Sequence, residues 1–235
     1  LVSESAGEGV ILNVFEPLLT YPQGNGPPVP GMAESYEVSE DGLVYTFRLR
    51  KGALWSNGRE VVAGDFVYSW RRVLAPETGS KAAHLLWYVK GAKDYNLGKL
   101  PTERVAEVGV RAIDERTLEV TLESPTPFFP SLVTAMPYAP VPREAIEAHG
   151  PRWTRPENIV VNGPFTISEW TIRDKTVLVK NEKYWDAASV KLPGARILHN
   201  ESEVNAFQLY ESGKAHHTPG QVPVEQVKGF LANGR

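Results

Sequence analysis

Two histidines stand side by side at His216 and His217, and a pair of imidazoles is the minimum that could begin a metal site. Neighbouring side chains in an extended strand point to opposite faces, so both rings could reach one metal only from an irregular loop. The surrounding stretch GKAHHTPGQ is rich in turn-forming residues. We therefore interpret the pair as a solvated turn and predict no metal site.

Two pairs of acidic residues could act as general acid and general base, Glu40 with Asp41 and Glu201 with Glu203. Each pair lies beside a turn signal, where acidic side chains commonly serve solubility and capping. The sequence has no G-x-S-x-G, G-x-x-x-x-G-K-[ST] or H-E-x-x-H motif, and it has no cysteine for thiol chemistry. We predict a protein that is not an enzyme and that carries no cofactor.

The composition is that of an ordinary globular protein, with 42% hydrophobic and 23% charged residues among 235. Its 25 basic and 28 acidic residues leave a net charge of -3, so nucleic acid is not an expected partner. No apolar stretch approaches the roughly 20 residues of a membrane helix. The stretch LVSESAGEGVILNVF lacks the basic and apolar segments of a signal peptide.

Hydrophobic periodicity predicts the elements that would carry a site. Residues 5–19 have apolar side chains at helical spacing, and residues 33–50 alternate as a β-hairpin whose buried face holds Tyr45, Phe47 and Leu49. A helix is predicted from Ala63, with Asp65 in its first turn. The same rules predict helices at 82–93, 128–134, 143–149, 202–212 and 223–231, two strands within 108–122, a hairpin within 163–180 and a strand at 195–200. This mixture is typical of an α/β or α+β fold.

Two short motifs are interpreted as scaffold. The stretch from Asn162 to Phe165 is typical of a chain reversal, in which Gly163 would supply an unusual backbone angle. The stretch NEKYWD, residues 181–186, is typical of an aromatic anchor after a strand. The six tryptophans all lie in or near predicted elements, so we expect most of them to pack in the core.

Three longer stretches together carry a family resemblance: residues 30–74, which contain WSNGREVVAGDFVYSW, residues 121–133 (TLESPTPFFPSLV) and residues 158–186. In order and spacing they resemble the oligopeptide- and dipeptide-binding receptors of bacterial ABC importers, the family 5 extracellular solute-binding proteins. The resemblance covers essentially the whole chain. It implies a mixed α/β fold like that of the type II periplasmic binding proteins, with one lobe and the extra family-specific domain present and the second lobe absent from this chain.

By the same resemblance, residues 22–160 form domain II, the family-specific scaffold, and residues 1–21 with 161–235 form part of domain I, the ligand-binding lobe. The family groups that fix the ends of a bound peptide lie largely on the second lobe. With return strands and that lobe missing, the chain is expected to show open sheet edges and apolar surface, which the missing C-terminal lobe of the same protein or another chain would cover.

The resemblance also implies where a ligand is contacted on the lobe that is present. One contact is the segment before the first helix, here Ser3, Glu4 and Ser5. A second is the connection after the 202–212 helix, here Pro219, Gly220 and Gln221. Pro219 and Gly220 stand where oligopeptide receptors typically have a tyrosine and an asparagine, which leaves backbone groups and Gln221 to bond a ligand. A third contact is in the loop between the helices of domain II, where Ala82 stands in place of a further family tyrosine. These departures leave room for a wider pocket or a different ligand.

The function implied is the substrate-binding component of an ABC importer, which binds oligopeptides in an extended conformation between two lobes and delivers them to a membrane permease. The same scaffold could be dedicated to a dipeptide, a sugar, a nickel complex or a signalling peptide, or serve as a sensory or interaction module outside transport. The implied location is the periplasm or the outer face of the membrane, reached by secretion with or without a lipid anchor.

Overall fold

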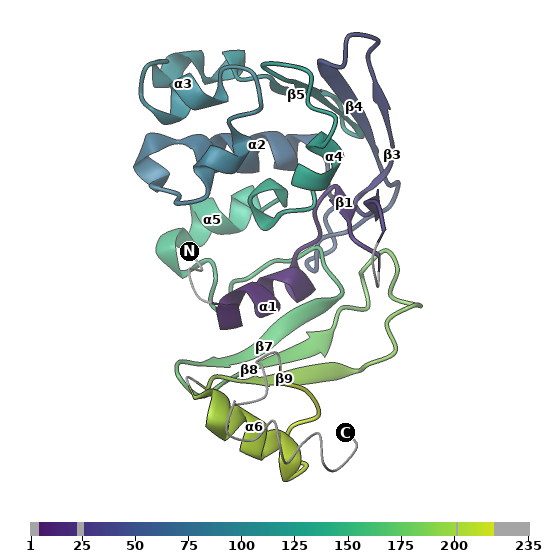
Figure 1. Cartoon of the computed structure of the whole chain (residues 1–235), viewed down its shortest axis with the longest axis vertical. Helices are drawn as coiled ribbons and strands as arrows, with labels where there is room; N and C mark the ends of the chain where they lie inside the picture. The colour runs from purple at the N-terminus through teal and green to yellow at the C-terminus, as the bar shows by residue number, and fades with distance from the viewer. Residues whose placement is uncertain (1–4, 23–25, 201, 219–235) are drawn as a thin grey trace, which may run out of the picture.

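The computed structural model describes residues 5–22, 26–200 and 202–218. Figure 1 shows an upper part (residues 33–153), built on a four-stranded sheet, and a lower part (residues 5–16, 163–200 and 202–218), built on a three-stranded sheet. In the described ranges no helix has both the length and the apolar character needed to cross a bilayer.

The sheet of the upper part is antiparallel, and its pairing follows the alternation seen in the sequence. Tyr45, Phe47 and Leu49 turn inward and are buried, whereas Arg48 faces solvent, so the predicted hairpin is confirmed. The strand order is β3 (Ala33–Val38), β4 (Val44–Leu49), β6 (Thr117–Thr121) and β5 (Val110–Asp114).

Helix α2 (Ala63–Leu74) packs on the inner face of this sheet. Phe66, Trp70 and Leu74 recur every four residues and are fully buried, which gives the helix its core-facing stripe. The Trp70 indole donates a hydrogen bond of 2.8 Å to the Tyr138 carbonyl, so its polar end is satisfied inside the core. Shorter elements complete the upper part: α3 (Ala92–Asn96), α4 (Phe129–Leu132), α5 (Arg143–His149) and 3₁₀ helices at Pro76–Thr78, Ala83–Leu86, Thr102–Glu107, Met136–Tyr138 and Gly150–Arg152.

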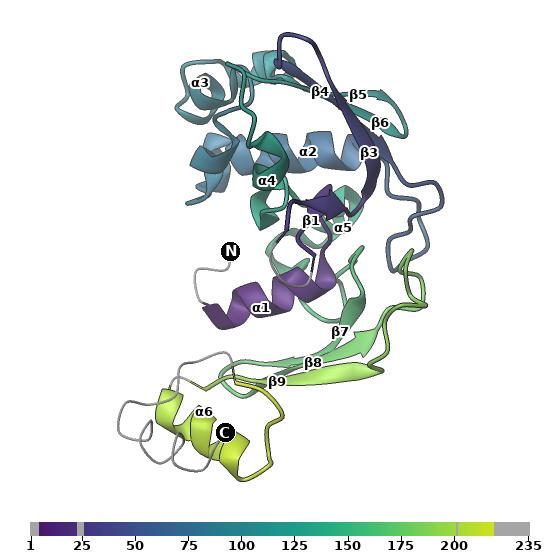
Figure 2. The same ribbon diagram turned by 45° about the vertical axis from the view of Figure 1, so that its right-hand side comes forward.

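The lower part has the sheet order β7 (Phe165–Thr171), β8 (Lys175–Lys180) and β9 (Gly194–Leu198), all antiparallel. Helix α1 (Ser5–Val14) lies between this sheet and the helices of the upper part, and α6 (Glu203–Glu211) lies on the other side of the sheet (Figures 1 and 2). A two-stranded pair, β1 (Leu19–Thr20) with β2 (Val29–Pro30), leads from α1 into the upper part.

Helix α1 ends at Val14, five residues before the predicted end at residue 19, and the backbone shows why. The Phe15 amide still donates to the Ile11 carbonyl at 2.9 Å, but the Glu16 amide donates to the Asn162 side chain at 3.1 Å. Pro17 then has no N–H to continue the helix. The Glu16 amide therefore bonds to the distant Asn162 side chain and not, as the local pattern predicts, to a carbonyl within the helix.

The helix predicted at 82–93 is also interrupted. The chain forms a 3₁₀ helix at Ala83–Leu86, a bridge from Val89 to Leu122, and then α3 from Ala92. Gly91 between them has a φ of 70°, a conformation that an α-helix excludes. The segment predicted at 223–231 lies outside the described residues, and the division of the chain at residues 22 and 161 stays a prediction.

Candidate functional site

Most of the predicted ligand-contact residues lie outside the described part of the chain. This is so for Ser3, Glu4, Pro219, Gly220 and Gln221, while Ser5 is the first residue of α1. Ala82 is described: it is half-buried just before the 3₁₀ helix, and its carbonyl accepts from the Leu85 amide at 3.1 Å. These contacts stay predictions.

A different constellation dominates the boundary between the upper and lower parts, and we call it the α1 joint: Glu16, Asn162, Gly163, Tyr184 and Trp185. Its first component is the Asn162 side chain, which is 1% exposed. The Asn162 amide oxygen accepts from the Glu16 backbone N–H at 3.1 Å, and its NH₂ donates to the Glu16 carbonyl at 2.9 Å. One side chain thereby satisfies both backbone groups of a residue 146 positions away.

The second component of the α1 joint is the Glu16 carboxylate. One of its oxygens accepts from the Tyr184 hydroxyl and the other from the Trp185 indole, each at 2.6 Å. Burial raises the pKa of the Glu16 carboxyl, while these two hydrogen bonds and the nearby Arg50 guanidinium act to lower it. The Arg50 guanidinium lies over the Trp185 ring, 3.7 Å from its centroid, within cation–π range. Burial also raises the pKa of Tyr184, and the adjacent carboxylate adds to that shift.

The third component is Gly163, and it corrects one expectation from the sequence. Gly163 does not have a positive φ, so it does not supply an unusual backbone angle. Instead its amide donates to the Val14 carbonyl at 2.9 Å, and a Cβ at this position would lie 2.6 Å from the Val14 carbonyl carbon. Close approach of two backbones, not conformation, requires glycine here.

Tyr184 and Trp185, interpreted from the sequence as an aromatic anchor after a strand, hold Glu16 in this way, and no motif in the sequence predicts the role of Glu16 itself. The available signal was a carboxylate inside the apolar run VFEPLL. A buried acid in such a run requires hydrogen-bond partners from elsewhere in the fold. The local sequence pattern does not indicate that residues near 185 supply these hydrogen-bond partners.

A second buried carboxylate, Asp65, forms a network of hydrogen bonds inside the upper part. It accepts from the Trp55 indole at 3.0 Å and from the Val62 amide at 3.0 Å, and it pairs with Arg59 at 2.8 Å. These partners lie within ten residues of Asp65, in the WSNGREVVAGDF stretch. Asp65 and its neighbours therefore serve the scaffold.

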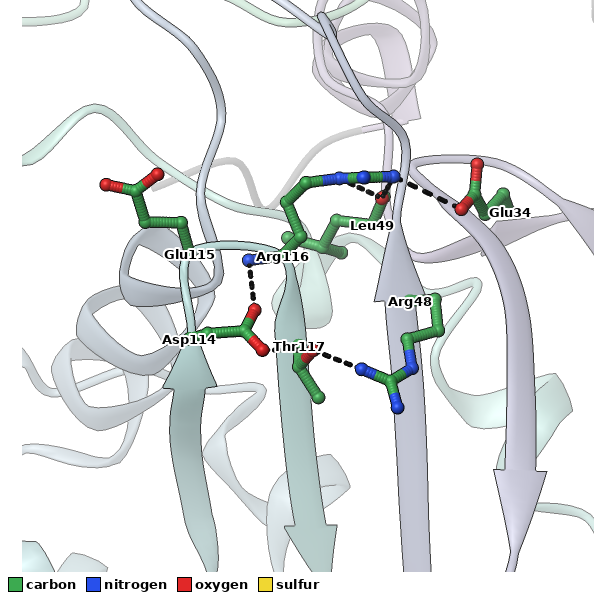
Figure 3. Close-up of a pocket in the computed structure, with 7 residues that line it drawn as sticks. All are labelled: Glu34, Arg48, Leu49, Asp114, Glu115, Arg116 and Thr117. Atoms are coloured by element: carbon green, nitrogen blue, oxygen red, sulfur yellow. Dashed lines mark hydrogen bonds and ion pairs between the residues drawn. The ribbon is translucent and has the colours of Figure 1, made fainter.

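A polar hollow of about 420 Å³ lies at the end of the upper sheet (Figure 3). Arg116 donates to the Leu49 carbonyl at 2.8 Å and to Glu34 at 3.2 Å. Thr117 accepts from Arg48 at 2.5 Å and donates to Asp114 at 2.8 Å. Most of these groups bond to one another, and Leu49 is the one aliphatic residue in the lining, so the hollow lacks the hydrophobic and aromatic side chains that line most small-molecule pockets.

The histidine pair considered for metal binding, and Asp41 of the acidic pairs, lie in surroundings unlike those of a metal site or a general acid. His216 and His217 are exposed after α6, and no three His, Asp or Glu side chains of the described ranges come together as metal ligands. Asp41 accepts from the Ser39 hydroxyl at 2.5 Å and from the Leu43 amide at 3.0 Å, as expected of a turn residue. These bonds lower the pKa of Asp41, opposite to what a general acid needs at neutral pH. Glu201 lies outside the described residues.

Comparison with known proteins decides the family. The model of the bacterial extracellular solute-binding proteins, family 5 (middle), matches residues 27–233. The chain belongs to this family. The oligopeptide-binding protein OppA of Escherichia coli is 41% identical over 215 residues, which is 91% of this chain and 39% of that protein. OppA of Bacillus subtilis is 38% identical over 239 residues, 100% of this chain and 43% of the relative.

Solved structures of this family have the same fold. The Haemophilus influenzae OppA complex with the peptide RPPGFSPFR aligns with a TM-score of 0.91 at 33% identity, over 96% of this chain and 44% of that one. Burkholderia pseudomallei OppA aligns with a TM-score of 0.85 at 38% identity, over 91% of this chain and 41% of that one. The predicted fold class is confirmed, and the chain spans about two fifths of the length of these relatives.

Proposed function

We propose that this chain is part of the substrate-binding component of an ABC importer, which binds oligopeptides in an extended conformation between two lobes and delivers them to a membrane permease. The observation that carries the proposal is the alignment with the peptide complex of Haemophilus influenzae OppA over 96% of this chain. The role is binding and delivery, without catalysis.

The chemistry of such binding suits a receptor that tolerates many sequences. An extended peptide offers its main-chain donors and acceptors to strand-like edges of the protein, and hydrated pockets accept its side chains without selecting among them. On this lobe we propose that Ser3, Glu4 and Ser5, the Pro219–Gly220–Gln221 connection and the neighbourhood of Ala82 contribute contacts. Main-chain recognition then supplies affinity, and side-chain tolerance follows.

A second candidate is a dedicated receptor for another solute, because relatives at similar identity carry different names. The probable deoxycholate-binding protein YgiS of Escherichia coli is 36% identical over 228 residues, and the dipeptide-binding protein DppE of Bacillus subtilis is 39% identical over 188. These values lie close to those for the oligopeptide-binding relatives, so overall identity does not separate the two functions. The Ala82, Pro219 and Gly220 departures favour keeping this candidate.

The proposed location in the cell follows from the family, whose members are named extracellular and periplasmic. We propose that the protein works in the periplasm or at the outer face of the membrane, with a lipid anchor as one means of attachment. Its proposed partners are the ligand, a membrane permease, and a second lobe supplied by the same protein or by another chain.

Native mass spectrometry of the longest obtainable form of the protein, followed by denaturation to release whatever it carries, tests the proposal. Peptides of mixed sequence and narrow length would support an oligopeptide receptor. A single defined species, whether bile acid, sugar, metal chelate or one peptide, would contradict it and support the dedicated receptor. Stripped protein challenged with tri-, tetra- and penta-alanine, and separately with deoxycholate, provides the matched comparison.

A further inference from the structure

Two carboxylates are buried within the described part of the chain, Asp65 at 5% and Glu16 at 8% exposure. Asp65 has an arginine partner at 2.8 Å, whereas both Glu16 oxygens bind uncharged ring donors at 2.6 Å. Burying a carboxylate costs free energy that hydrogen bonds offset only where their geometry is fixed. The α1 joint holds residue 16 in one place, through both of its backbone groups and both of its carboxylate oxygens.

The position that is held is the end of a short helix. Glu16 follows the last residue of α1 by two positions, and Gly163 binds the Val14 carbonyl directly. Phe15 packs its ring against Trp153 of the upper part, with centroids 6.3 Å apart. A 10-residue helix is too short to be stable by itself, so its direction depends on these attachments.

The direction of α1 determines the position of its other end, which begins at Ser5. Ten residues span about 15 Å, so a tilt of roughly 10° at the joint displaces the far end by about 2.5 Å. Binding sites lose affinity when a contact group moves by that distance, because hydrogen bonds weaken steeply away from their preferred geometry. Ser5, the first residue of α1, is one of the proposed contact residues.

We propose that Glu16 is a positioning residue for ligand binding: clamped between Tyr184 and Trp185, it sets the direction of α1 and with it the position of Ser5. The proposal rests on the proposed function, because that function assigns ligand contact to the start of α1. Glu16 itself touches no ligand. It acts through the helix.

The test compares three variants of the longest obtainable form of the protein. Glu16→Ala removes the clamp. Glu16→Gln restores it, because the Gln oxygen can accept from the Trp185 indole while its NH₂ donates to the Tyr184 oxygen. Asp65→Ala is the matched control, since it removes an equally buried carboxylate that also binds a tryptophan indole but lies within α2.

Hydrogen exchange of the α1 amides without ligand is the first measurement. We expect exchange in Glu16→Ala to be about tenfold faster than in wild type, with Glu16→Gln close to wild type and Asp65→Ala unchanged in α1. Equal exchange of α1 in Glu16→Ala and wild type would overturn the proposal. So would equal acceleration of α1 in Glu16→Ala and Asp65→Ala, because the effect would then be general destabilisation.

Calorimetric titration with tri-, tetra- and penta-alanine is the second measurement. We expect Glu16→Ala to bind about tenfold more weakly, with recovery in Glu16→Gln and little change in Asp65→Ala. Faster α1 exchange with unchanged peptide affinity would overturn the positioning role. If wild type binds none of these peptides, the proposed function fails, and the same titration with the solute that co-purifies decides the role of Glu16.

Discussion

At the scale of single residues, the molecule uses its two buried carboxylates in different ways. Asp65 is neutralised locally by Arg59 and joins groups within one stretch of sequence. Glu16 is held by rings that follow it by 168 and 169 positions, so its energetics couple distant segments. The two residues should therefore respond differently to pH and to mutation.

The Glu16 carboxyl should leave a signature in the pH dependence of stability. Burial raises its pKa above the ordinary value of 4.5, Asp186 adds to the rise, and Tyr184, Trp185 and Arg50 oppose it. In the window above 4.5 the folded protein then binds more protons than the unfolded chain, so this contribution to stability decreases as pH rises. Relative to Glu16→Gln, wild type should lose stability as pH increases through this window.

Urea unfolding of wild type and Glu16→Gln from about pH 4 to about pH 8 measures this difference, and the other titrating groups cancel in the comparison. Because Arg50 and Asp186 face the same carboxyl, both must stay unchanged in the two proteins. A stability difference that is flat over the range, or that changes in the opposite sense, would contradict a desolvated carboxyl at Glu16.

Asp65→Ala should destabilise the protein by about 3 kcal/mol, because it leaves the Trp55 indole, the Val62 amide and the Arg59 guanidinium without their acceptor. The control is Glu144→Ala, which removes the other, exposed carboxylate near Arg59, at 3.3 Å. Exposed pairs contribute less than about 1 kcal/mol, so this change should be small. Equal midpoints for the two variants in denaturant would refute the assigned role of Asp65.

At the scale of elements, two glycine substitutions can separate the effect of close packing from that of helix propensity. Gly163→Ala should cost about 1–3 kcal/mol, because the new Cβ would lie 2.6 Å from the Val14 carbonyl carbon. Gly9→Ala, in the middle of exposed α1 surface with no heavy atom within 4 Å, should gain about 0.5–1 kcal/mol. Thermal unfolding measures both, and stabilisation by Gly163→Ala would contradict the close approach.

Elements whose pairing is local were predicted well from the sequence. The β3–β4 and β5–β6 hairpins follow from alternation and turn residues close in the chain, and α2 from its apolar stripe. The end of α1 could not be predicted, because the bond that stops the helix comes from Asn162. For the same reason Glu16 was missed, and the role of Gly163 was attributed to backbone conformation. Long-range contacts decided each of these.

At the scale of the whole molecule, the lower part leaves large apolar side chains in solvent. Ile172 and Leu192 are each 63% exposed, and Leu12 of α1 is 57% exposed. Ile172 and Leu192 lie at opposite ends of the β7–β8–β9 sheet, so apolar side chains are exposed along its length, where another element or chain could cover them. This agrees with a partner lobe on the lower part, which stays a proposal.

We expect this chain alone to self-associate at tens of micromolar, roughly the range in which exposed apolar patches drive aggregation. Substituting Ile172→Lys together with Leu192→Lys, which lie at opposite ends of the sheet, should reduce the association, because charge at both ends opposes burial of the apolar side chains there. Leu97→Lys changes a leucine of the upper part that is 49% exposed and is the matched control. Light scattering decides the matter: a monodisperse monomer before any substitution would contradict a surface that requires cover.

The span of the α1 joint has a consequence for the order in which the protein is made. Glu16 and Asn162 are 146 residues apart, so a ribosome adding about 5–20 residues per second exposes the first roughly 7–30 s before the second. All residues of the upper part emerge during that interval. Glu16 therefore leaves the ribosome hydrated and unpaired, and α1 waits without its anchor while the sheet and α2 can assemble. Helix α1 is then among the last of these elements to become fixed, and a chaperone that recognises unpacked apolar helices would meet it in that interval.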